Sequence, residues 1–286
     1  MNTMRRALVL AGGGYVASSW EIGLVTGMAD AGLDVRDADL FVGTSAGARV
    51  ALDLASGKAL EEFYQMRAGP DLPPLEPPRM VDWARLRAGL DDAKKAGGSP
   101  TEILRRVGAL ALAAAVGKGS DRREIVATQL PLQAWPQQRV LIVTLNAETG
   151  ERHAFDKDSG IDLVDAVIAT TAFFGSPPTL FNGQYYIDGG FYSSDNADLA
   201  TGYERVLILA LRPPPQAMRL VSLDIGVEAL RAAGAQVEVI HPDEETLAAL
   251  VSTGGIMNPA SGRPAATAGR LQGQRSVSER IASFWR

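Results

Sequence analysis

Residues 39–48 spell DLFVGTSAGA, a stretch that is expected to join a strand to a helix through a tight turn around one serine. The apolar run at 40–42 is typical of a strand buried on both faces, as strands in parallel sheets are. Residues 43–47 match G-x-S-x-G, in which the serine stands at the point of a strained strand-to-helix turn. Good helix formers follow at 48–55. We therefore expect Ser45 at the carboxyl edge of a sheet, where the start of a helix favours developing negative charge.

Two glycines frame this turn. Gly43 and Gly47 are expected there because a Cβ at either position would collide where the strand leaves and the helix enters. The same pentapeptide also occurs in turns that carry no chemistry, so by itself it assigns no role to Ser45. Further groups elsewhere in the chain are needed to distinguish a catalytic serine from a structural one.

The N-terminal part of the chain supplies a glycine-rich loop. An apolar run at 7–11, which predicts a second buried strand, ends in Gly12, Gly13 and Gly14, and these can turn several N–H groups toward one point. Dinucleotide binding requires G-x-G-x-x-G and an acidic residue after the next strand, and a P-loop requires Gly-Lys-Ser/Thr, but the sequence has neither pattern. An oxyanion hole fits better, because hydrolases aim such N–H donors at a tetrahedral intermediate.

A helix is expected after this loop. Ser18 and Glu21 have the spacing of a capping box, which predicts a helix that starts at Ser18 and runs to Ala31. Gly32 then stands at the C′ position, where glycine commonly ends a helix.

A hairpin far along the chain brings a carboxylate to a strand end. Two apolar runs flank Asn182 and Gly183, which form the strongest short hairpin signal, and the second run ends at Asp188. Gly189 and Gly190 follow and would give close access to this carboxylate. An ordinary turn aspartate is the alternative interpretation of Asp188.

These three motifs, in this order, resemble the patatin-like phospholipase family. The stretch AFFGSPP at 172–178 and Asn196 add to the resemblance, which runs from about residue 8 to residue 211. The resemblance implies a three-layer α/β fold with a mostly parallel central sheet and helices on both faces. It also implies a lipid acyl hydrolase of phospholipase A or lysophospholipase type that uses no cofactor and no metal.

The resemblance also assigns roles to single residues. It implies a Ser-Asp dyad without histidine, in which Ser45 is the nucleophile that forms an acyl-serine intermediate and Asp188 is its base. The N–H groups of the glycine loop are implied to form the oxyanion hole (Gly12, Gly13, Gly14). Supporting positions are the glycines of the serine turn and those that follow the aspartate (Gly43, Gly47, Gly189, Gly190).

The glycine loop departs from the family pattern at two positions. The family loop continues with a basic residue and a glycine, where this chain has Val16 and Ala17. The missing cation removes one source of oxyanion stabilisation, and an alanine narrows the backbone freedom of the loop. A catalytically weak or silent protein that binds acyl chains or lipids is therefore the alternative function.

Composition sets the broad class. A chain of 286 residues with 46% hydrophobic and 21% charged residues can bury a sizeable core, and we interpret 1–286 as a single domain. The net charge of −5 argues against a nucleic-acid partner and against strong attraction to anionic membranes. The absence of cysteine excludes disulfides and thiolate metal sites. We expect a cytoplasmic protein that contacts membrane surfaces transiently to reach a lipid ester, and the sequence leaves its oligomeric state open.

Residues 58–128 differ in character from the rest. A proline cluster at 70–78 precedes two helical patterns, 81–96 and 101–116, and the second is apolar nearly all round. Such a helix is either a buried core helix or a mobile lid over an acyl-chain groove. We therefore treat 58–128 as a helical, proline-rich insertion and a candidate lid.

The remaining patterns alternate strands with helices, which predicts a mostly parallel sheet covered on both faces. Strands are expected at 140–145, 151–155, 206–211 and 236–240, and helices at 161–172, capped near Ser159, and at 221–233, closed by Gly234. Residues 262–285 are rich in Ala, Arg and Ser, and we expect a surface helix or a partly disordered segment there.

His241 offers a rival to the dyad. The order Ser45, Asp188, His241 is that of a conventional Ser-Asp-His esterase, and His241 follows a predicted strand. Against this triad, a histidine-orienting aspartate has no reason to precede two glycines. The chain's other histidine, His153, is expected to face solvent in a short hairpin.

Overall fold

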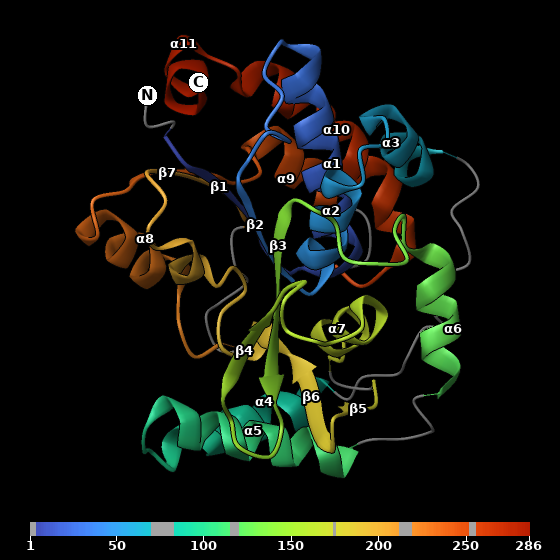
Figure 1. Cartoon of the computed structure of the whole chain (residues 1–286), viewed down its shortest axis with the longest axis vertical. Helices are drawn as coiled ribbons and strands as arrows, with labels where there is room; N and C mark the ends of the chain where they lie inside the picture. The colour runs from blue at the N-terminus through green and yellow to red at the C-terminus, as the bar shows by residue number, and fades with distance from the viewer. Residues whose placement is uncertain (1–3, 70–82, 115–119, 174–175, 212–218, 252–255) are drawn as a thin grey trace.

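The computed structural model describes residues 4–69, 83–114, 120–173, 176–211, 219–251 and 256–286. Within these residues the strands form one eight-stranded sheet (Figure 1). The strands are β1 (Arg6–Leu10), β2 (Leu40–Thr44), β3 (Arg139–Asn146), β4 (Arg152–Phe155), β5 (Thr179–Phe181), β6 (Gln184–Asp188), β7 (Arg205–Leu209) and β8 (Gln236–Ile240). Each strand is hydrogen-bonded to the next along the path β5-β6-β3-β2-β1-β7-β8, and β4 also pairs with β3.

The centre of the sheet is parallel. Strands β3, β2, β1, β7 and β8 pair in parallel, whereas β4 and β6 are antiparallel to β3 and β5 is antiparallel to β6. Every residue of β2 is buried, as expected for a strand covered on both faces. The mostly parallel α/β sheet predicted from the sequence is confirmed.

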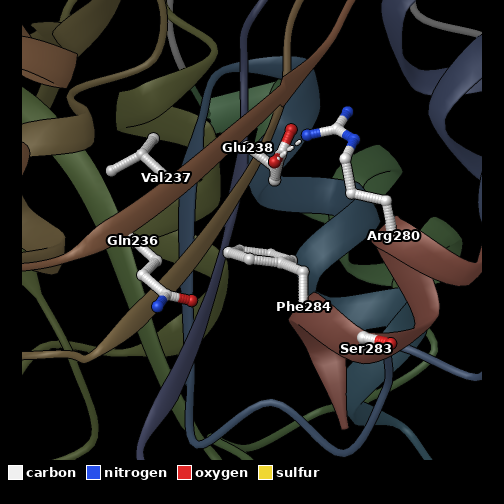
Figure 2. A pocket seen from close by; sticks show the side chains of 6 residues that line it. All are labelled: Gln236, Val237, Glu238, Arg280, Ser283 and Phe284. Atoms are coloured by element: carbon white, nitrogen blue, oxygen red, sulfur yellow. Dashed lines mark hydrogen bonds and ion pairs between the residues drawn. The ribbon is translucent and has the colours of Figure 1, made fainter.

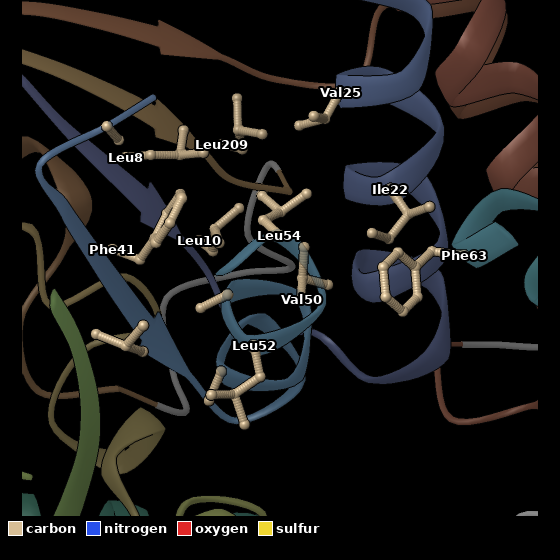
Figure 3. Packing of buried hydrophobic residues seen from close by; sticks show 14 of the residues in the cluster. Leu8, Leu10, Ile22, Val25, Phe41, Val50, Leu52, Leu54, Phe63 and Leu209 are labelled. Atoms are coloured by element: carbon tan, nitrogen blue, oxygen red, sulfur yellow. The ribbon is translucent and has the colours of Figure 1, made fainter. Parts of the chain in front are cut away.

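Helices cover both faces of the sheet, and successive residues of a strand are buried on opposite faces. The helices are α1 (Gly14–Asp30), α2 (Ala46–Ala55), α3 (Leu60–Ala68), α4 (Trp83–Lys95), α5 (Pro100–Ala114), α6 (Ser120–Gln129), α7 (Leu163–Thr170), α8 (Leu223–Ala232), α9 (Glu244–Val251), α10 (Gly262–Ser276) and α11 (Glu279–Trp285). Leu8 and Leu10 of β1 belong to the larger core, with α1, α2 and α3 (Figure 3). Ala7 and Val9 pack on the opposite face with Val227 of α8. Three layers result, as expected.

The beginning of α1 differs from the prediction. The helix begins at Gly14, four residues before the expected start, and Ser18 donates its hydroxyl to the carbonyl of Tyr15 at 3.3 Å. Glu21 is 0% exposed, and within the described residues both of its carboxyl oxygens lack a hydrogen-bond partner. The capping box is therefore wrong, because the helix continues directly from the glycine loop and carries Glu21 into the core.

The end of α1 follows the prediction. The helix ends at Asp30, and Gly32 has a φ of 86°. The N–H of Leu33 donates to the carbonyl of Met28 at 2.9 Å, which is the long hydrogen bond of a Schellman motif. Gly32 therefore stands at C′.

The C-terminal segment is part of the core rather than a loose surface helix. A Cβ at Gly27 of α1 would lie 2.0 Å from the carbonyl oxygen of Arg270, and one at Gly273 of α10 would lie 2.2 Å from that of Leu24. The two helices thus approach until their backbones touch. Trp285 of α11 is 1% exposed. The expectation of a surface helix or partial disorder was wrong, because small residues make close packing that an apolar pattern does not reveal.

The two insertion helices pack against the antiparallel side of the sheet (Figure 1). Leu104, Val107 and Ala111 of α5 are buried in a cluster with Leu145 of β3 and Ile187 of β6. The rest of α5 is more exposed, so the helix is buried on one side and not all round. The proline cluster at 70–78 lies outside the described residues, and the division into one domain with a lid stays a prediction.

Two further local predictions have different outcomes. Asn182 and Gly183 have φ values of 51° and 74°, which is the expected geometry of a tight hairpin turn between β5 and β6. Helix α7 begins at Leu163, later than expected, because the side chain of Asp162 and not Ser159 caps it, accepting from the N–H of Val164 at 2.9 Å.

Candidate functional site

The pairing of β3 explains how two distant strand ends meet. Val143 pairs with both β2 and β4, so these strands lie on opposite edges of β3. Leu145 pairs with both β4 and β6, so these two also lie on opposite edges. Because β3 has only two edges, β2 and β6 share one and run toward each other. Thr44, the last residue of β2, lies opposite Val143, and Asp188, the last residue of β6, lies opposite the adjacent Thr144.

Ser45 stands where β2 ends and α2 begins. Its backbone has φ 54° and ψ −119°, a strained conformation for a residue other than glycine, and it is the N-cap of α2. Its N–H donates to Oγ1 of Thr170 at 2.9 Å, which helps to hold this conformation. A Cβ at Gly47 would lie 2.1 Å from the carbonyl oxygen of Leu10, so only glycine allows α2 to leave the sheet this closely. The predicted elbow geometry is present.

The Asp188 carboxyl group is buried beside Ser45. Asp188 is 2% exposed, and its Oδ1 accepts a hydrogen bond from the N–H of Gly190 at 2.7 Å. Burial raises the pKa of Asp188 to about 6, opposed by hydrogen bonds from the Ser45 side chain and from Gly190. A carboxylate of this pKa at the strand end next to a serine hydroxyl is equipped to accept its proton near neutral pH.

The glycine loop passes directly over the serine. A Cβ at Gly12 would lie 3.1 Å from the Cβ of Ser45. The N–H of Gly12 donates to the carbonyl of Ser194 at 2.8 Å. Gly12 is therefore not available as an oxyanion donor, which corrects the prediction for this residue. Its role is to tie the loop to the segment that follows the aspartate.

Two donors of the loop remain available. Within the described part of the chain, the N–H groups of Gly13 and Gly14 have no hydrogen-bond acceptor. Gly14 has a φ of 63°, whereas Gly13 is extended at 162°. Because Gly14 is also the first residue of α1, the helix dipole favours negative charge at these donors.

The two positions that depart from the family pattern are buried. Val16 is 3% exposed and belongs to the larger core, and Ala17 is 0% exposed. The first turn of α1 therefore turns apolar side chains inward where the family pattern has a cation and a glycine. Neither residue supplies a positive charge near the serine.

Two further residues support the site, and no pattern in the sequence indicates the roles that they have. Thr170, at the end of α7, donates its hydroxyl to the carbonyl of Val143 at 2.5 Å while it accepts from Ser45. Asn196 is 0% exposed and donates to Oγ1 of Thr44 at 3.0 Å and to the carbonyl of Ser193 at 2.7 Å. Thr170 thus connects the end of α7 to β3 and to Ser45. Asn196 connects the loop after the aspartate to the end of β2.

Among the described residues, neither histidine is hydrogen-bonded to Ser45 or Asp188. His241 follows β8, which is three strands from β2 and hence roughly 14 Å away, and its Nδ1 is 2.7 Å from the carbonyl oxygen of Ala210. The Ser-Asp-His alternative is therefore wrong. His153 is half-buried and stacks on Phe155 with ring centroids 5.8 Å apart, so the expectation that it faces solvent was wrong as well.

A shallow pocket lies away from this site, between β8 and α11 (Figure 2). Its lining residues are Gln236, Val237, Glu238, Arg280, Ser283 and Phe284. Arg280 and Glu238 form an ion pair across it. Because β8 is the edge strand farthest from β6, this pocket plays no part in the arrangement around Ser45.

Comparison with known proteins covers the glycine loop, the serine turn and the aspartate motif together. The sequence model of the family described as Patatin-like phospholipase matches residues 8–201, which include all three motifs. The chain belongs to the patatin-like phospholipase family. A cGAMP-activated phospholipase of Vibrio cholerae serotype O1 is 31% identical over 173 residues, which cover 57% of this chain and 42% of that protein. The chain thus spans less than half the length of this curated relative.

Solved structures show more distant likeness. The type III effector ExoU from Pseudomonas aeruginosa has a TM-score of 0.40 and 16% identity, over 95% of this chain and 53% of that one. VipD from Legionella pneumophila has a TM-score of 0.40 and 14% identity, over 73% of this chain and 50% of that one. No helix among the described residues of this patatin-like protein is long and apolar enough to cross a bilayer.

Proposed function

We propose that this protein hydrolyses carboxylic esters of lipids, of phospholipase A or lysophospholipase type, through an acyl-Ser45 intermediate and a Ser45-Asp188 dyad. The observation that carries the proposal is the end-to-end meeting of β2 and β6, which brings together the strand ends that carry a strained serine and a buried carboxyl group. Family membership supports the lipid substrate class.

In the first half of the reaction, Ser45 Oγ attacks the ester carbonyl carbon while its proton moves to the Asp188 carboxylate. The oxyanion that forms accepts hydrogen bonds from the N–H groups of Gly13 and Gly14. The ester C–O bond then breaks, and Asp188 returns the proton to the leaving alcohol. Acyl-Ser45 remains.

In the second half, a water molecule gives a proton to Asp188 and attacks the acyl carbonyl through the same oxyanion hole. Collapse of this intermediate breaks the bond to Ser45 Oγ, which regains the proton from Asp188, and the carboxylic acid leaves. Because the substrate is a lipid, transient contact with a membrane surface from the cytoplasm forms part of the proposal.

A silent acyl-binding or lipid-binding protein is the alternative, and it is favoured by the buried Val16 and Ala17 at positions of the oxyanion loop. The test is hydrolysis of short-chain p-nitrophenyl and phospholipid esters. We expect Ser45→Ala to abolish turnover with the fold intact, Asp188→Asn to lower it by roughly 10²- to 10⁴-fold, and His241→Ala to change it little. A wild-type protein without turnover on any ester would favour the alternative.

A further inference from the structure

Arg219 lies on the segment that leads into α8, next to the loop after the candidate base. The N–H of Val221 donates to the carbonyl of Tyr192 at 2.8 Å, and that of Leu220 donates to the same carbonyl at 3.1 Å. Tyr192 follows the two glycines after Asp188. The main chain that carries Arg219 is therefore hydrogen-bonded to the wall of the site.

An insertion helix holds Arg219 from another side. Nζ of Lys94, near the end of α4, donates to the carbonyl of Arg219 at 2.9 Å. Burial lowers the pKa of Lys94, with a nearby Asp91 acting in the opposite direction. Two separate parts of the chain thus fix the main chain at Arg219, so the side chain starts from a fixed point beside the site.

The guanidinium of Arg219 has donors to spare. Within the described residues it makes no hydrogen bond and no ion pair. Burial lowers its pKa, while the carboxyl groups of Asp195 and Asp188 raise it from beyond ion-pair distance. A half-buried cation with unused N–H donors therefore lies within electrostatic reach of the dyad.

Asp195 makes no hydrogen bond to the guanidinium of this arginine. Asp195 is 1% exposed, and its carboxyl oxygens already accept from Ala197 N at 3.1 Å, Ser193 Oγ at 3.1 Å and Ser194 Oγ at 3.2 Å. These bonds satisfy a buried carboxylate without an arginine in direct contact. The free donors of the guanidinium are left for a group that enters from outside.

We propose that Arg219 binds the phosphate of a glycerophospholipid whose acyl ester lies at Ser45, an inference that rests on the proposed function. A planar guanidinium matches phosphate oxygens through two parallel N–H bonds, which a lysine cannot reproduce. The phosphate of such a lipid is only a few bonds from the scissile ester, so a cation beside the dyad reaches it while the carbonyl is at the serine. Arg219 thereby provides a cation for the substrate, although this chain has Val16 where the family pattern has a basic residue.

A binding experiment tests this without hydrolysis. In the Ser45→Ala background, calorimetry measures the affinity for a short-chain diether analogue of phosphatidylcholine below its micelle concentration. We expect Arg219→Gln to weaken binding by about 10- to 100-fold, the usual effect of losing hydrogen bonds to a charged group, and Arg219→Lys to weaken it less. Arg5→Gln is the matched control, because Arg5 is exposed just before β1, at the amino ends of the parallel strands, whereas Ser45 follows the carboxyl end of β2. This control is expected to leave the affinity unchanged.

A second arm measures specificity in the active protein. The ratio of kcat/KM for dihexanoyl phosphatidylcholine to that for dihexanoylglycerol should fall by about 10- to 100-fold in Arg219→Gln, mainly through KM for the phospholipid. An equal loss on both esters would overturn the proposal and make Arg219 a residue that acts through Asp188, which an altered pH profile would also reveal.

Other outcomes also overturn the inference. If Arg219→Gln and Arg219→Lys both fold and bind the diether lipid as the parent does, Arg219 does not contact the phosphate. If inorganic phosphate alone binds as tightly as the diether lipid, the site serves free phosphate and not a lipid headgroup. If the wild-type protein hydrolyses no ester but binds the diether lipid, and Arg219→Gln weakens that binding, the inference is supported. Only the proposed hydrolysis is then contradicted.

Discussion

The first turn of α1 and the middle of the same helix both depend on glycine, for different physical reasons. Gly14, at the first turn, has a φ of 63°, and its N–H is unused within the described residues. Gly23 and Gly27, in the middle, have ordinary helical backbone, and a Cβ at either would lie about 2 Å from a backbone oxygen of α10. The first turn needs glycine for conformation, and the middle needs it for space.

The consequence of losing a glycine therefore depends on what its backbone does. A glycine that aims a donor at a transition state affects turnover, because that charge does not exist in the bound ester. A glycine that admits another helix affects stability, because the two helices must separate to accept a side chain. Substitutions along α1 should therefore separate the two effects within one element.

The largest effect is expected at the first turn. In Gly14→Val, a β-branched residue cannot hold a φ of 63° without strain, and its Cβ would lie 2.6 Å from the carbonyl oxygen of Ile256, so the donor turns away. Turnover on one acyl ester should fall by roughly 10²- to 10³-fold, with little change in KM. Circular dichroism establishes that the variant is folded. A folded Gly14→Val with wild-type turnover would remove the loop from the mechanism.

A smaller effect of the other kind is expected in the middle of the helix. Gly27→Ala forces a methyl group against the carbonyl oxygen of Arg270, 2.0 Å away. The free energy of unfolding should fall by up to about 3 kcal/mol, measured by urea denaturation, because neither backbone can move aside freely. Turnover per folded molecule should stay at the wild-type value. If turnover falls as it does in Gly14→Val, the two regions are not independent.

The smallest effect is expected at the end of α1. Gly32 has a φ of 86°, and a Cβ there would contact nothing within 4 Å, so Gly32→Val tests conformation without crowding. The unfolding free energy should fall by about 1 kcal/mol, the cost of a left-handed residue, and turnover should not change. A loss as large as that of Gly27→Ala would show that strain and not space dominates along this helix.

Most of the fold could be predicted because its signals are local. The runs that form β1 and β2, the Asn182-Gly183 hairpin and the Gly32 helix end each depend on a few adjacent residues. The predictions of two other features were wrong, because these features depend on residues that are distant in the sequence. Residues 262–285 pack through glycine and alanine, which show no apolar pattern, and Glu21 is buried because α1 begins earlier than its capping signal indicates.

The candidate site follows the same division. Ser45 and Asp188 could be proposed from motifs, but their proximity depends on the register by which β2 and β6 share one edge of β3. The hydrogen bond from Gly12 to Ser194, which removes a predicted donor, and the contribution of Thr170 arise from loops that meet only in the folded chain. No local pattern specifies such contacts.

Reaction of Ser45 with a fluorophosphonate, followed across pH, tests the dyad most directly, because only an activated serine is phosphonylated at an appreciable rate. Burial raises the pKa of Asp188 to about 6, so its carboxylate is lost as the pH falls below 6 and is present above it. We predict that the labelling rate rises as the pH increases through about 6 and is then constant, and that Asp188→Asn lowers it by roughly 10²- to 10⁴-fold. His241→Ala should keep the wild-type profile. An unlabelled Ser45, or equal labelling of wild type and Asp188→Asn, would contradict the dyad.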